Sequence, residues 1–262
     1  MKKEKRPGSH VKADDFISCI VCDGYASHIK SLDNGYNIFK CLKCHMEFIW
    51  PMPDTRTLKN FYSGYYDFRA DERVLLKNAK RNIHRLNKFG LNKELSLLDY
   101  GSGKGFFVKH SRSDNWRNYD PFTSDSNEDF LLQGYYNWAT LWGVIEHLVD
   151  PVETLTYVSD LLAPGSYLAA TTVSIELPIP FQYKPPEHLI YWTRSALEQL
   201  FSKAGLEILE YSQYYMIQLS EVYMSIILRT VPPHYCKKIR NDLPEFVEVP
   251  TNEVFIVAKK SG

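Results

Sequence analysis

The stretch that decides the fold, residues 97–108, reads Leu97-Leu98-Asp99-Tyr100-Gly101-Ser102-Gly103-Lys104-Gly105-Phe106-Phe107-Val108. It begins with a short apolar run, typical of a buried parallel strand, and an acid follows that run. Glycines then occupy alternate positions before an amphipathic segment. Glycine is required where the backbone turns sharply and stays bare enough for a ligand to lie against it. The stretch predicts a strand, a ligand-binding turn and a helix, although glycines that serve packing alone would leave the same pattern.

Two later segments stand at informative distances from this turn. Asp120 follows a predicted strand over residues 115–119, about twenty residues after the first acid, where a carboxylate could accept both hydroxyls of a ribose. The alternative is that Asp120 is a turn residue that caps Pro121. Farther on, residues 140–151 read Thr-Leu-Trp-Gly-Val-Ile-Glu-His-Leu-Val-Asp-Pro. The three segments together are more specific than the glycines alone.

Residues 95–210 resemble the class I S-adenosylmethionine-dependent methyltransferases, in particular the subgroup with an acid-x-Gly-x-Gly-x-Gly motif and a Glu-His-Leu-x-Asp-Pro motif. The resemblance implies an α/β fold with a Rossmann-like, seven-stranded methyltransferase sheet and helices on both faces. It also implies that S-adenosylmethionine is the cofactor: the glycines would admit its amino-acid end, Asp99 would fix its amino group and Asp120 would hold its ribose. The residues that we assign to cofactor binding on this basis are Asp99, Gly101, Gly103, Gly105, Asp120 and Trp142.

Catalytic candidates follow the predicted strand over residues 137–142, because ligands bind at the carboxyl edge of a parallel sheet. Glu146 and His147 could orient and remove a proton there, or both could hold the loop in place. A second Glu-His-Leu segment contains His188, and in similar sugar methyltransferases such a histidine borders the acceptor, so His188 is the first candidate for general base. Tyr65, in an aromatic patch at residues 61–68, could reach the acceptor unless the patch only packs the N-terminal segment against the core.

Residues 14–52 are predicted to form a zinc ribbon. Two Cys-x-x-Cys pairs flank a turn signal at residues 33–35, and four thiolates complete a closed tetrahedron around a structural Zn²⁺. His28 and His45 are nearby nitrogens that could replace a sulfur, and four reduced thiols in a small core are the alternative to a metal site. The expected ligands are Cys19, Cys22, Cys41 and Cys44.

Length and composition limit the size, the location and the partners that we expect for this protein. The chain has 262 residues with 44% hydrophobic content, enough for one full core and a small accessory unit. It contains no apolar run long enough for a membrane span, and its basic start, residues 1–13, reads as a disordered tail rather than a secretion signal, so we expect a cytoplasmic protein. The formal net charge is zero, which argues against a nucleic-acid partner.

The methyltransferase domain is expected over residues 53–262, with two departures from the family. Residues 121–137 are too few and too polar for the usual third helix and strand, and only residues 130–133 could form a short strand, which leaves the adenine contacts open. Residues 217–250 exceed a hairpin loop, so a helical insertion is expected there. Its apolar stretch, residues 222–228, either covers the active site or pairs with another subunit, as in a homodimer.

A zinc ribbon before this core is similar to sugar C-methyltransferases of nucleotide-sugar and polysaccharide pathways. We therefore expect methylation, at carbon or oxygen, of a small hydroxylated acceptor such as a sugar or nucleotide-sugar. An RNA methyltransferase is an alternative, because zinc ribbons often hold nucleic acid and Lys40, Lys43 and Trp50 could form a local basic patch. A cofactor-fold protein that has lost activity and serves as a binding module is another, given the contracted region after Asp120.

Overall fold

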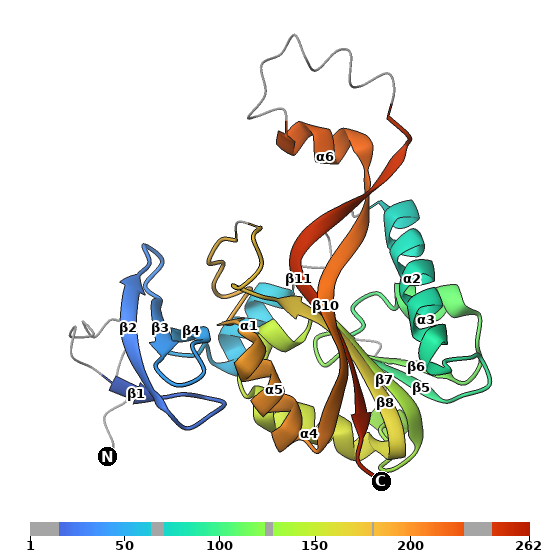
Figure 1. Cartoon of the computed structure of the whole chain (residues 1–262), viewed down its shortest axis with the longest axis horizontal. Coiled ribbons are helices and arrows are strands. Elements are labelled where there is room, and N and C mark those ends of the chain that lie inside the picture. The colour runs from blue at the N-terminus through green and yellow to red at the C-terminus, as the bar shows by residue number, and fades with distance from the viewer. Residues whose placement is uncertain (1–15, 64–70, 124–127, 180, 228–242) are drawn as a thin grey trace.

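The computed structural model describes residues 16–63, 71–123, 128–179, 181–227 and 243–262. Two sheets organise these residues (Figure 1). A five-stranded sheet with the order β1-β2-β3-β4-β9 carries the cysteine pairs, and a six-stranded sheet with the order β10-β11-β8-β7-β5-β6 forms the centre of the larger body. The α/β methyltransferase fold expected from the sequence is therefore confirmed.

The smaller sheet is antiparallel throughout. Its strands are β1 (Phe16–Ser18), β2 (Tyr25–Ser31), β3 (Asn37–Cys41), β4 (Glu47–Trp50) and β9 (Ile190–Tyr191). The last of these comes from far along the chain and pairs with β4, so that Glu47 lies opposite Tyr191 and Phe48 opposite Ile190. The smaller sheet is thus completed by a strand from the segment that follows β8, so the N-terminal unit is held by strand pairing as well as by the chain connection.

The larger sheet is parallel in its centre and antiparallel at one edge. The parallel strands are β5 (Leu97–Tyr100), β6 (Trp116–Tyr119), β7 (Tyr136–Trp142) and β8 (Leu162–Val173). The antiparallel strands are β10 (Leu206–Leu219) and β11 (Phe246–Lys260). Because Glu253 of β11 lies opposite Val173, where β8 ends, the antiparallel strand brings an acid to the carboxyl edge of the parallel ones.

The expected seventh strand is absent from the described residues. A short 3₁₀ helix, η3 (Glu128–Phe130), begins the region where the sequence left room for a short strand over residues 130–133, and no strand forms there. A parallel strand needs a crossover of a dozen or more residues besides its own length, and the chain from Asp120 to Tyr136 does not supply both. In the described sheet β6 therefore forms an edge.

Helices cover both faces of the larger sheet (Figure 1). On one face α2 (Glu72–Leu86) and α3 (Phe106–Ser111) pack on a cluster that contains Leu97 and Trp138. On the other face α4 (Pro151–Leu161) and α5 (Arg194–Lys203) pack on Leu98 and Leu141, in the same cluster as the core of the smaller sheet. The remaining helices are α1 (Thr55–Tyr62), α6 (Ser220–Ile227) and the 3₁₀ turns η2 (Asn87–Phe89) and η4 (Ile145–His147).

Side-chain hydrogen bonds cap the N-termini of α2, α4 and α5. The Asp71 carboxylate accepts a hydrogen bond from the backbone N–H of Arg73, Asp150 accepts one from Glu153, and Thr193 accepts one from Ala196. Each cap satisfies a donor that the first turn leaves without a partner, and such a bond typically stabilises a helix by about 1 kcal/mol.

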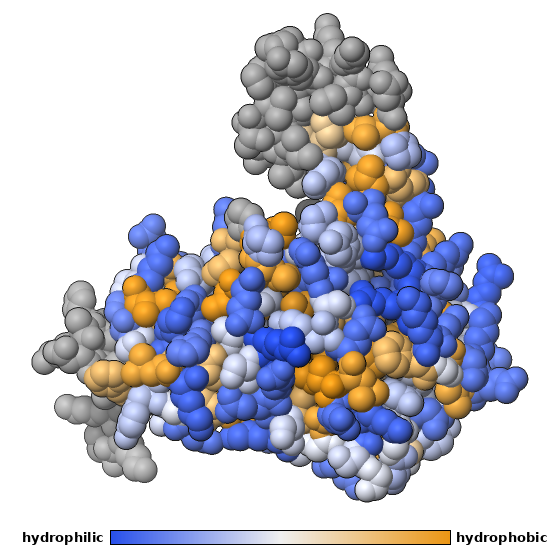
Figure 2. Space-filling view, in the orientation of Figure 1, coloured by the Kyte–Doolittle hydropathy of each residue, from blue (hydrophilic) through white to orange (hydrophobic). Residues whose placement is uncertain are grey.

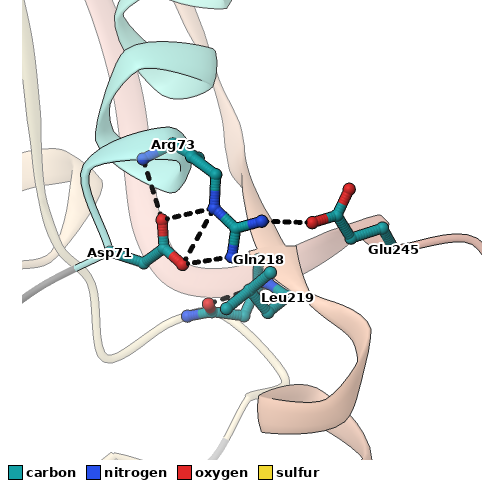
Figure 3. Close-up of polar contacts among 5 residues, drawn as sticks. All are labelled: Asp71, Arg73, Gln218, Leu219 and Glu245. Carbon is teal, nitrogen blue, oxygen red and sulfur yellow. Dashed lines mark hydrogen bonds and ion pairs between the residues drawn. The ribbon is translucent and has the colours of Figure 1, made fainter.

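β10 and β11 extend beyond the sheet as an arm that carries α6 (orange to red at the top of Figure 1). Arg73 of α2 pairs with Asp71, at 2.7 Å, and with Glu245, which directly precedes β11 beside the start of α6 (Figure 3). Leu209, Tyr215 and Val222 are exposed, and Figure 2 shows apolar surface along this region. Within residues 217–250, where a helical insertion was expected, the structure shows α6 between two strand ends, and residues 228–242 lie outside the described residues.

The turn from β5 to α3 has a backbone conformation that residues other than glycine rarely adopt. Gly101, Gly103 and Gly105 have φ angles of +72°, +54° and +70°, in the left-handed region that favours glycine. A Cβ atom on Gly101 would lie 2.6 Å from Cγ2 of Val144, a buried side chain of the neighbouring loop. The turn therefore needs glycine at its first position for space as well as for conformation.

Replacing Gly101 by Ala tests this steric requirement. Gly165→Ala is the matched control, because Gly165 has φ +76° and nothing within 4 Å of the added Cβ. Both variants carry the backbone strain, and only Gly101→Ala also overpacks the loop, so we expect it to lose about 1–3 kcal/mol more of the free energy of unfolding. Denaturant unfolding measures both losses, and equal losses would show that Val144 moves aside at no cost.

Candidate functional site

A cavity of about 460 Å³ lies at the carboxyl edge of the central strands. Its wall includes the backbone from Gly101 to Gly103, the side chains of Asp120 and Trp142, and one side of His147. The volume is typical of a site for a small organic ligand. We call it the glycine-turn cavity, and it stands where the sequence predicted bare backbone for a ligand.

Asp120 closes the turn and also faces this cavity. Its Oδ2 accepts a hydrogen bond of 2.8 Å from the Gly103 N–H, and its Oδ1 accepts one of 2.9 Å from the Phe122 N–H. A carboxylate oxygen has more than one acceptor position, so a hydrogen bond from a backbone N–H does not by itself prevent it from accepting a ligand hydroxyl. The structure thus brings Asp120 together with the glycine turn, as a ribose-binding role requires.

Asp99 lies behind the cavity wall and not in it. Its side chain is buried, with Oδ1 2.7 Å from the Thr140 hydroxyl that donates to it, and it does not line the glycine-turn cavity. Burial raises the pKa of Asp99 to about 7, with the nearby Asp120 charge adding to the shift and the Thr140 hydrogen bond opposing it. Gly105 also stands outside the wall, beside Asn118.

Trp142 lines the cavity and has a donor to offer. Its indole Nε1 is buried and has no hydrogen-bond partner in the part of the chain that the structure describes. Its ring stacks on Phe255, with centroids 6.2 Å apart, which fixes the indole against the sheet. A buried donor without a partner costs free energy, so a ligand in this cavity that accepts from Nε1 would recover it.

A second cavity, of about 530 Å³, adjoins the first. Gly143 and His147 line both, so the two cavities meet at these residues. The second cavity contains two more of the predicted catalytic residues, Glu146 and His188. Its other polar side chains are Gln182, Lys184, Glu187, Tyr191, Asn252 and Glu253. We call it the polar cavity.

His147 has a defined orientation at the junction. Its Nδ1 lies 2.5 Å from the carbonyl oxygen of Glu187, which can only accept, so Nδ1 carries the hydrogen. The Tyr62 hydroxyl is 3.1 Å from the same nitrogen. The Nε2 lone pair is thereby left free, 3.9 Å from Oε1 of Glu146. The His188 ring stands at 85° to the His147 ring, with the centroids 5.0 Å apart.

Burial dominates the titration of these groups. It lowers the pKa of His147 and, together with the charges of His147 and Lys184, lowers that of His188 to about 3. It raises the pKa of Glu146 to about 7, which a hydrogen bond from the Thr172 hydroxyl partly opposes. It likewise raises the pKa of Glu253 to about 7, helped by the charge of Glu146. The histidines are therefore neutral at neutral pH, while both carboxyls titrate there.

The smaller sheet supports one wall of the polar cavity. The Ile49 N–H of β4 donates to the Leu189 carbonyl, at 2.9 Å, and the Leu189 N–H donates to the Glu146 carbonyl, at 2.8 Å. The Tyr183 hydroxyl donates to Oε2 of Glu47, at 2.6 Å. These bonds link β4 to the segment that carries His188, so the N-terminal unit holds part of the candidate site.

The four cysteines predicted as zinc ligands come together in this unit. Their Sγ atoms lie within 4.8 Å of one another, with Cys19 and Cys44 3.7 Å apart and Cys22 and Cys41 3.3 Å apart. Sulfur atoms around a tetrahedral Zn²⁺ lie about 3.8 Å apart, since Zn–S bonds are about 2.3 Å long. The backbone N–H groups of Lys43 and Cys44 point to Cys41 Sγ. The residues fit a structural zinc ion, and His28 and His45 are not in the cluster.

The comparisons with known proteins agree with this geometry. Residues 70–211, more than half of the chain, match the methyltransferase domain family, and the chain belongs to that family. It is therefore an S-adenosylmethionine-dependent methyltransferase, and its acceptor is not defined by the match. No curated protein sequence matches the chain.

Two solved structures are among those that match the chain. One is a chain from the complex between the Haloferax volcanii Trm112 methyltransferase activator and a methyltransferase, with 14% identity, a TM-score of 0.53, and coverage of 78% of this chain and 97% of that one. The other is the 1,6-didemethyltoxoflavin-N1-methyltransferase of Burkholderia thailandensis, with 15% identity, a TM-score of 0.49, and coverage of 89% and 99%. In the described residues, no helix is both long and apolar enough to cross a membrane.

The sequence interpretation did not single out three residues of the site. Tyr62, not Tyr65, is seen to contact His147, and Tyr65 lies outside the described residues. Glu253 stands at the carboxyl edge because β11 is antiparallel, and its only signal is an acid directly before the apolar run at residues 254–258. Lys184 lines the polar cavity from a proline-rich loop that gives no periodic signal.

The variant Asp99→Asn tests whether Asp99 supports the fold from behind the cavity wall or contacts the cofactor directly. A carboxyl whose pKa is raised on folding favours the folded state below its unfolded pKa near 4, and that contribution is lost as the pH rises through about 7. The neutral amide does not titrate and so avoids this loss. From pH 5 to pH 8, the difference in unfolding free energy between the variant and the unaltered protein should therefore shift in favour of the variant by at least about 1 kcal/mol. Denaturant unfolding at both pH values provides the measurement.

The same variant should change the Kd for S-adenosylmethionine by less than about threefold, because Asp99 does not line the cavity. Calorimetry checks this expectation. A loss of affinity of about tenfold or more would place Asp99 in contact with the cofactor, as the sequence resemblance implies.

Cys41→Ser tests the link between the cysteine cluster and the polar cavity. Loss of one thiolate should release the metal ion and loosen β4, because thiolate ligation supplies folding free energy to so small a unit. The Leu189 amide, which is held by this network, should then exchange hydrogen faster, while β5 and β7 should remain protected. Leu42→Ser, at an exposed position between the ligands, is the control. Unchanged exchange at residues 187–191 in Cys41→Ser would contradict the link.

Proposed function

We propose that this methyltransferase acts on a small hydroxylated acceptor, most simply a sugar or nucleotide-sugar, and methylates it at oxygen or carbon. The observation that carries the proposal is the polar cavity, which opens onto the glycine-turn cavity at Gly143 and His147. A methyl donor in one cavity and an acceptor in the other would meet at that junction. Alignment of this kind can supply most of the catalysis of a transfer step.

The lining of the polar cavity supports a hydroxylated ligand. Gln182 and Asn252 offer amide donors and acceptors, and Tyr191 contributes a phenol ring on one side. Lys184 adds a positive charge that suits the phosphate of a nucleotide-sugar. A ligand with several hydroxyls pairs with such a wall more completely than an apolar one does, because it leaves fewer buried polar groups without partners.

S-adenosylmethionine, when bound, supplies a methyl group made electrophilic by its positive sulfur. The glycine turn and Asp120 would hold it, since the bare backbone of Gly101 and Gly103 and the Asp120 carboxylate line the glycine-turn cavity. His147 and Gly143 would place the acceptor atom at the junction. In transfer to a hydroxyl, the C–S bond breaks, a C–O bond forms and the hydroxyl proton must leave, so the remaining task for the chain is to take that proton.

We assign proton removal to Glu253. His188, the first candidate from the sequence, has a pKa lowered to about 3 and is therefore a weak proton acceptor at neutral pH. Glu253 lines the same cavity with a pKa raised to about 7, close to the value at which a general base is most effective. In this arrangement His188 binds the acceptor and Glu253 accepts its proton.

The RNA alternative has less support. Of the residues suggested as a basic patch, Lys40 is ion-paired with Glu47, at 3.1 Å, which reduces its attraction for phosphate. The polar cavity instead offers a small, mixed set of donors and acceptors to a compact ligand.

A panel assay tests the proposal directly. The protein is incubated with S-adenosylmethionine and, separately, with free sugars, nucleotide-sugars and RNA, and each product is examined by mass spectrometry for one added methyl group. We expect methylation of a sugar or nucleotide-sugar and none of RNA. Methylation of RNA alone would overturn the proposal.

Glu253→Gln should lower kcat by about 10²-fold or more, as expected for loss of a general base, and should leave the Kd for S-adenosylmethionine within about threefold. Glu207→Gln, at an exposed position on β10, is the matched control and should retain full activity. A normal kcat in Glu253→Gln would exclude Glu253 as the proton acceptor.

A further inference from the structure

Glu146, His147 and His188 form a compact cluster on the wall of the polar cavity. One ligand atom of each, a carboxylate oxygen or a ring nitrogen, lies within 4.8 Å of the other two. We propose that this cluster binds a divalent transition-metal ion, separate from the four-cysteine site. The existence of the site does not depend on the identity of the acceptor, whereas the role of the ion in catalysis rests on the function proposed above.

His147 is prepared as a metal ligand. Its Nδ1–H donates to the Glu187 carbonyl, so the ring is held in place and the Nε2 lone pair points away from that bond. Metal-binding histidines commonly carry such a bond from the other ring nitrogen to a carbonyl or carboxylate, because it fixes the tautomer and makes the ligating nitrogen more basic. The free Nε2 lies 3.9 Å from Oε1 of Glu146.

Glu146 supplies a buried carboxylate whose Oε1 atom faces His147. Its side chain is almost inaccessible, and Oε2 accepts a hydrogen bond of 2.7 Å from the Thr172 hydroxyl. In the part of the chain that the structure describes, Glu146 lies at ion-pair distance from His147 and from no lysine or arginine. The Glu253 carboxyl lines the same cavity. A buried carboxylate without a cation is unfavourable, and a divalent ion would offset that cost.

The distances are close to those of a coordination sphere. Ligand atoms around an ion with bonds of about 2.0–2.2 Å lie about 3–4 Å apart, so a movement of about 1 Å would close this cluster on an ion. Two imidazoles and one carboxylate favour Zn²⁺, Fe²⁺ or Co²⁺ over Mg²⁺ or Ca²⁺, which prefer oxygen. The cluster lines the cavity, so an oxygen atom of the acceptor could complete the coordination.

An ion here would act on the acceptor and not on the methyl donor. A hydroxyl bound to the ion has a lowered pKa, which would ease transfer of its proton to Glu253. The two histidines would then serve as ligands, each through one ring nitrogen of the cluster. The site thus gives His147 and His188 a role as ligands and leaves the proton to Glu253.

Co²⁺ is the probe, because its spectrum separates the two sites. The protein is purified with one Zn²⁺ per chain in the four-cysteine site and titrated with Co²⁺ by calorimetry and absorption. We expect one Co²⁺ to bind with ligand-field bands only, since a thiolate-to-cobalt charge-transfer band would arise at the cysteines alone. Glu146→Gln and His188→Ala should each weaken binding by about tenfold or more.

His84→Ala is the matched control, because His84 is an exposed histidine on α2, and it should bind Co²⁺ as the unaltered protein does. Glu146→Gln retains the side-chain volume and the acceptor for Thr172, so it carries the test if His188→Ala does not fold. Absence of Co²⁺ binding beyond the four-cysteine site, a charge-transfer band, or unchanged affinity in the folded variants would each overturn the metal site.

The Kd for S-adenosylmethionine and methylation of the acceptor panel are measured on the same samples. Normal Co²⁺ binding without methylation of any hydroxylated acceptor would contradict the proposed function and leave the metal site standing. Normal methylation with no Co²⁺ binding would contradict the metal site and leave the proposed function standing. The two proposals therefore fail in distinguishable ways.

Discussion

The structure depends on a hydrogen bond between neighbouring strand ends, from the Gly103 N–H to the Asp120 carboxylate. It joins the turn after β5 to the end of β6, and the backbone that it holds has no Cβ between the sheet and the cavity above it. Because Gly101 also lies against Val144, the turn touches the loop after β7 as well. One turn of bare backbone thus sets the relative positions of three strand ends, and the remainder of the site is built on their edge.

The N-terminal unit extends this arrangement to the acceptor side. A four-cysteine cluster lies in a small sheet whose last strand, β9, comes from the segment after β8. Hydrogen bonds then run from Ile49 through Leu189 to Glu146, so that the sheet with the cysteine cluster and the buried acid are linked by one chain of contacts. The polar cavity stands at the end of this chain, and its residues come from segments that are far apart in the sequence.

The sequence predicted the local features well because each has its cause within a few residues. The glycine turn and the paired cysteines are patterns of this kind. The short region after Asp120 was recognised as a departure, but its outcome, a six-stranded sheet, required knowing whether so short a segment could build a strand.

The site was harder to predict because it depends on contacts between distant segments. The pairing of β4 with β9 and the arrival of Glu253 opposite Val173 have no local signal. The place of Asp99 behind the wall, and the lowered pKa of His188, follow from burial, which a motif does not record.

A crystal structure of the protein with S-adenosylhomocysteine tests most directly whether the glycine turn is the cofactor site. We expect the ligand to lie over Gly101 and Gly103, with its ribose hydroxyls at Asp120 and its sulfur facing the junction of the two cavities at His147. A ligand bound elsewhere, or a ribose that does not reach Asp120, would contradict the claim that this turn is the cofactor site.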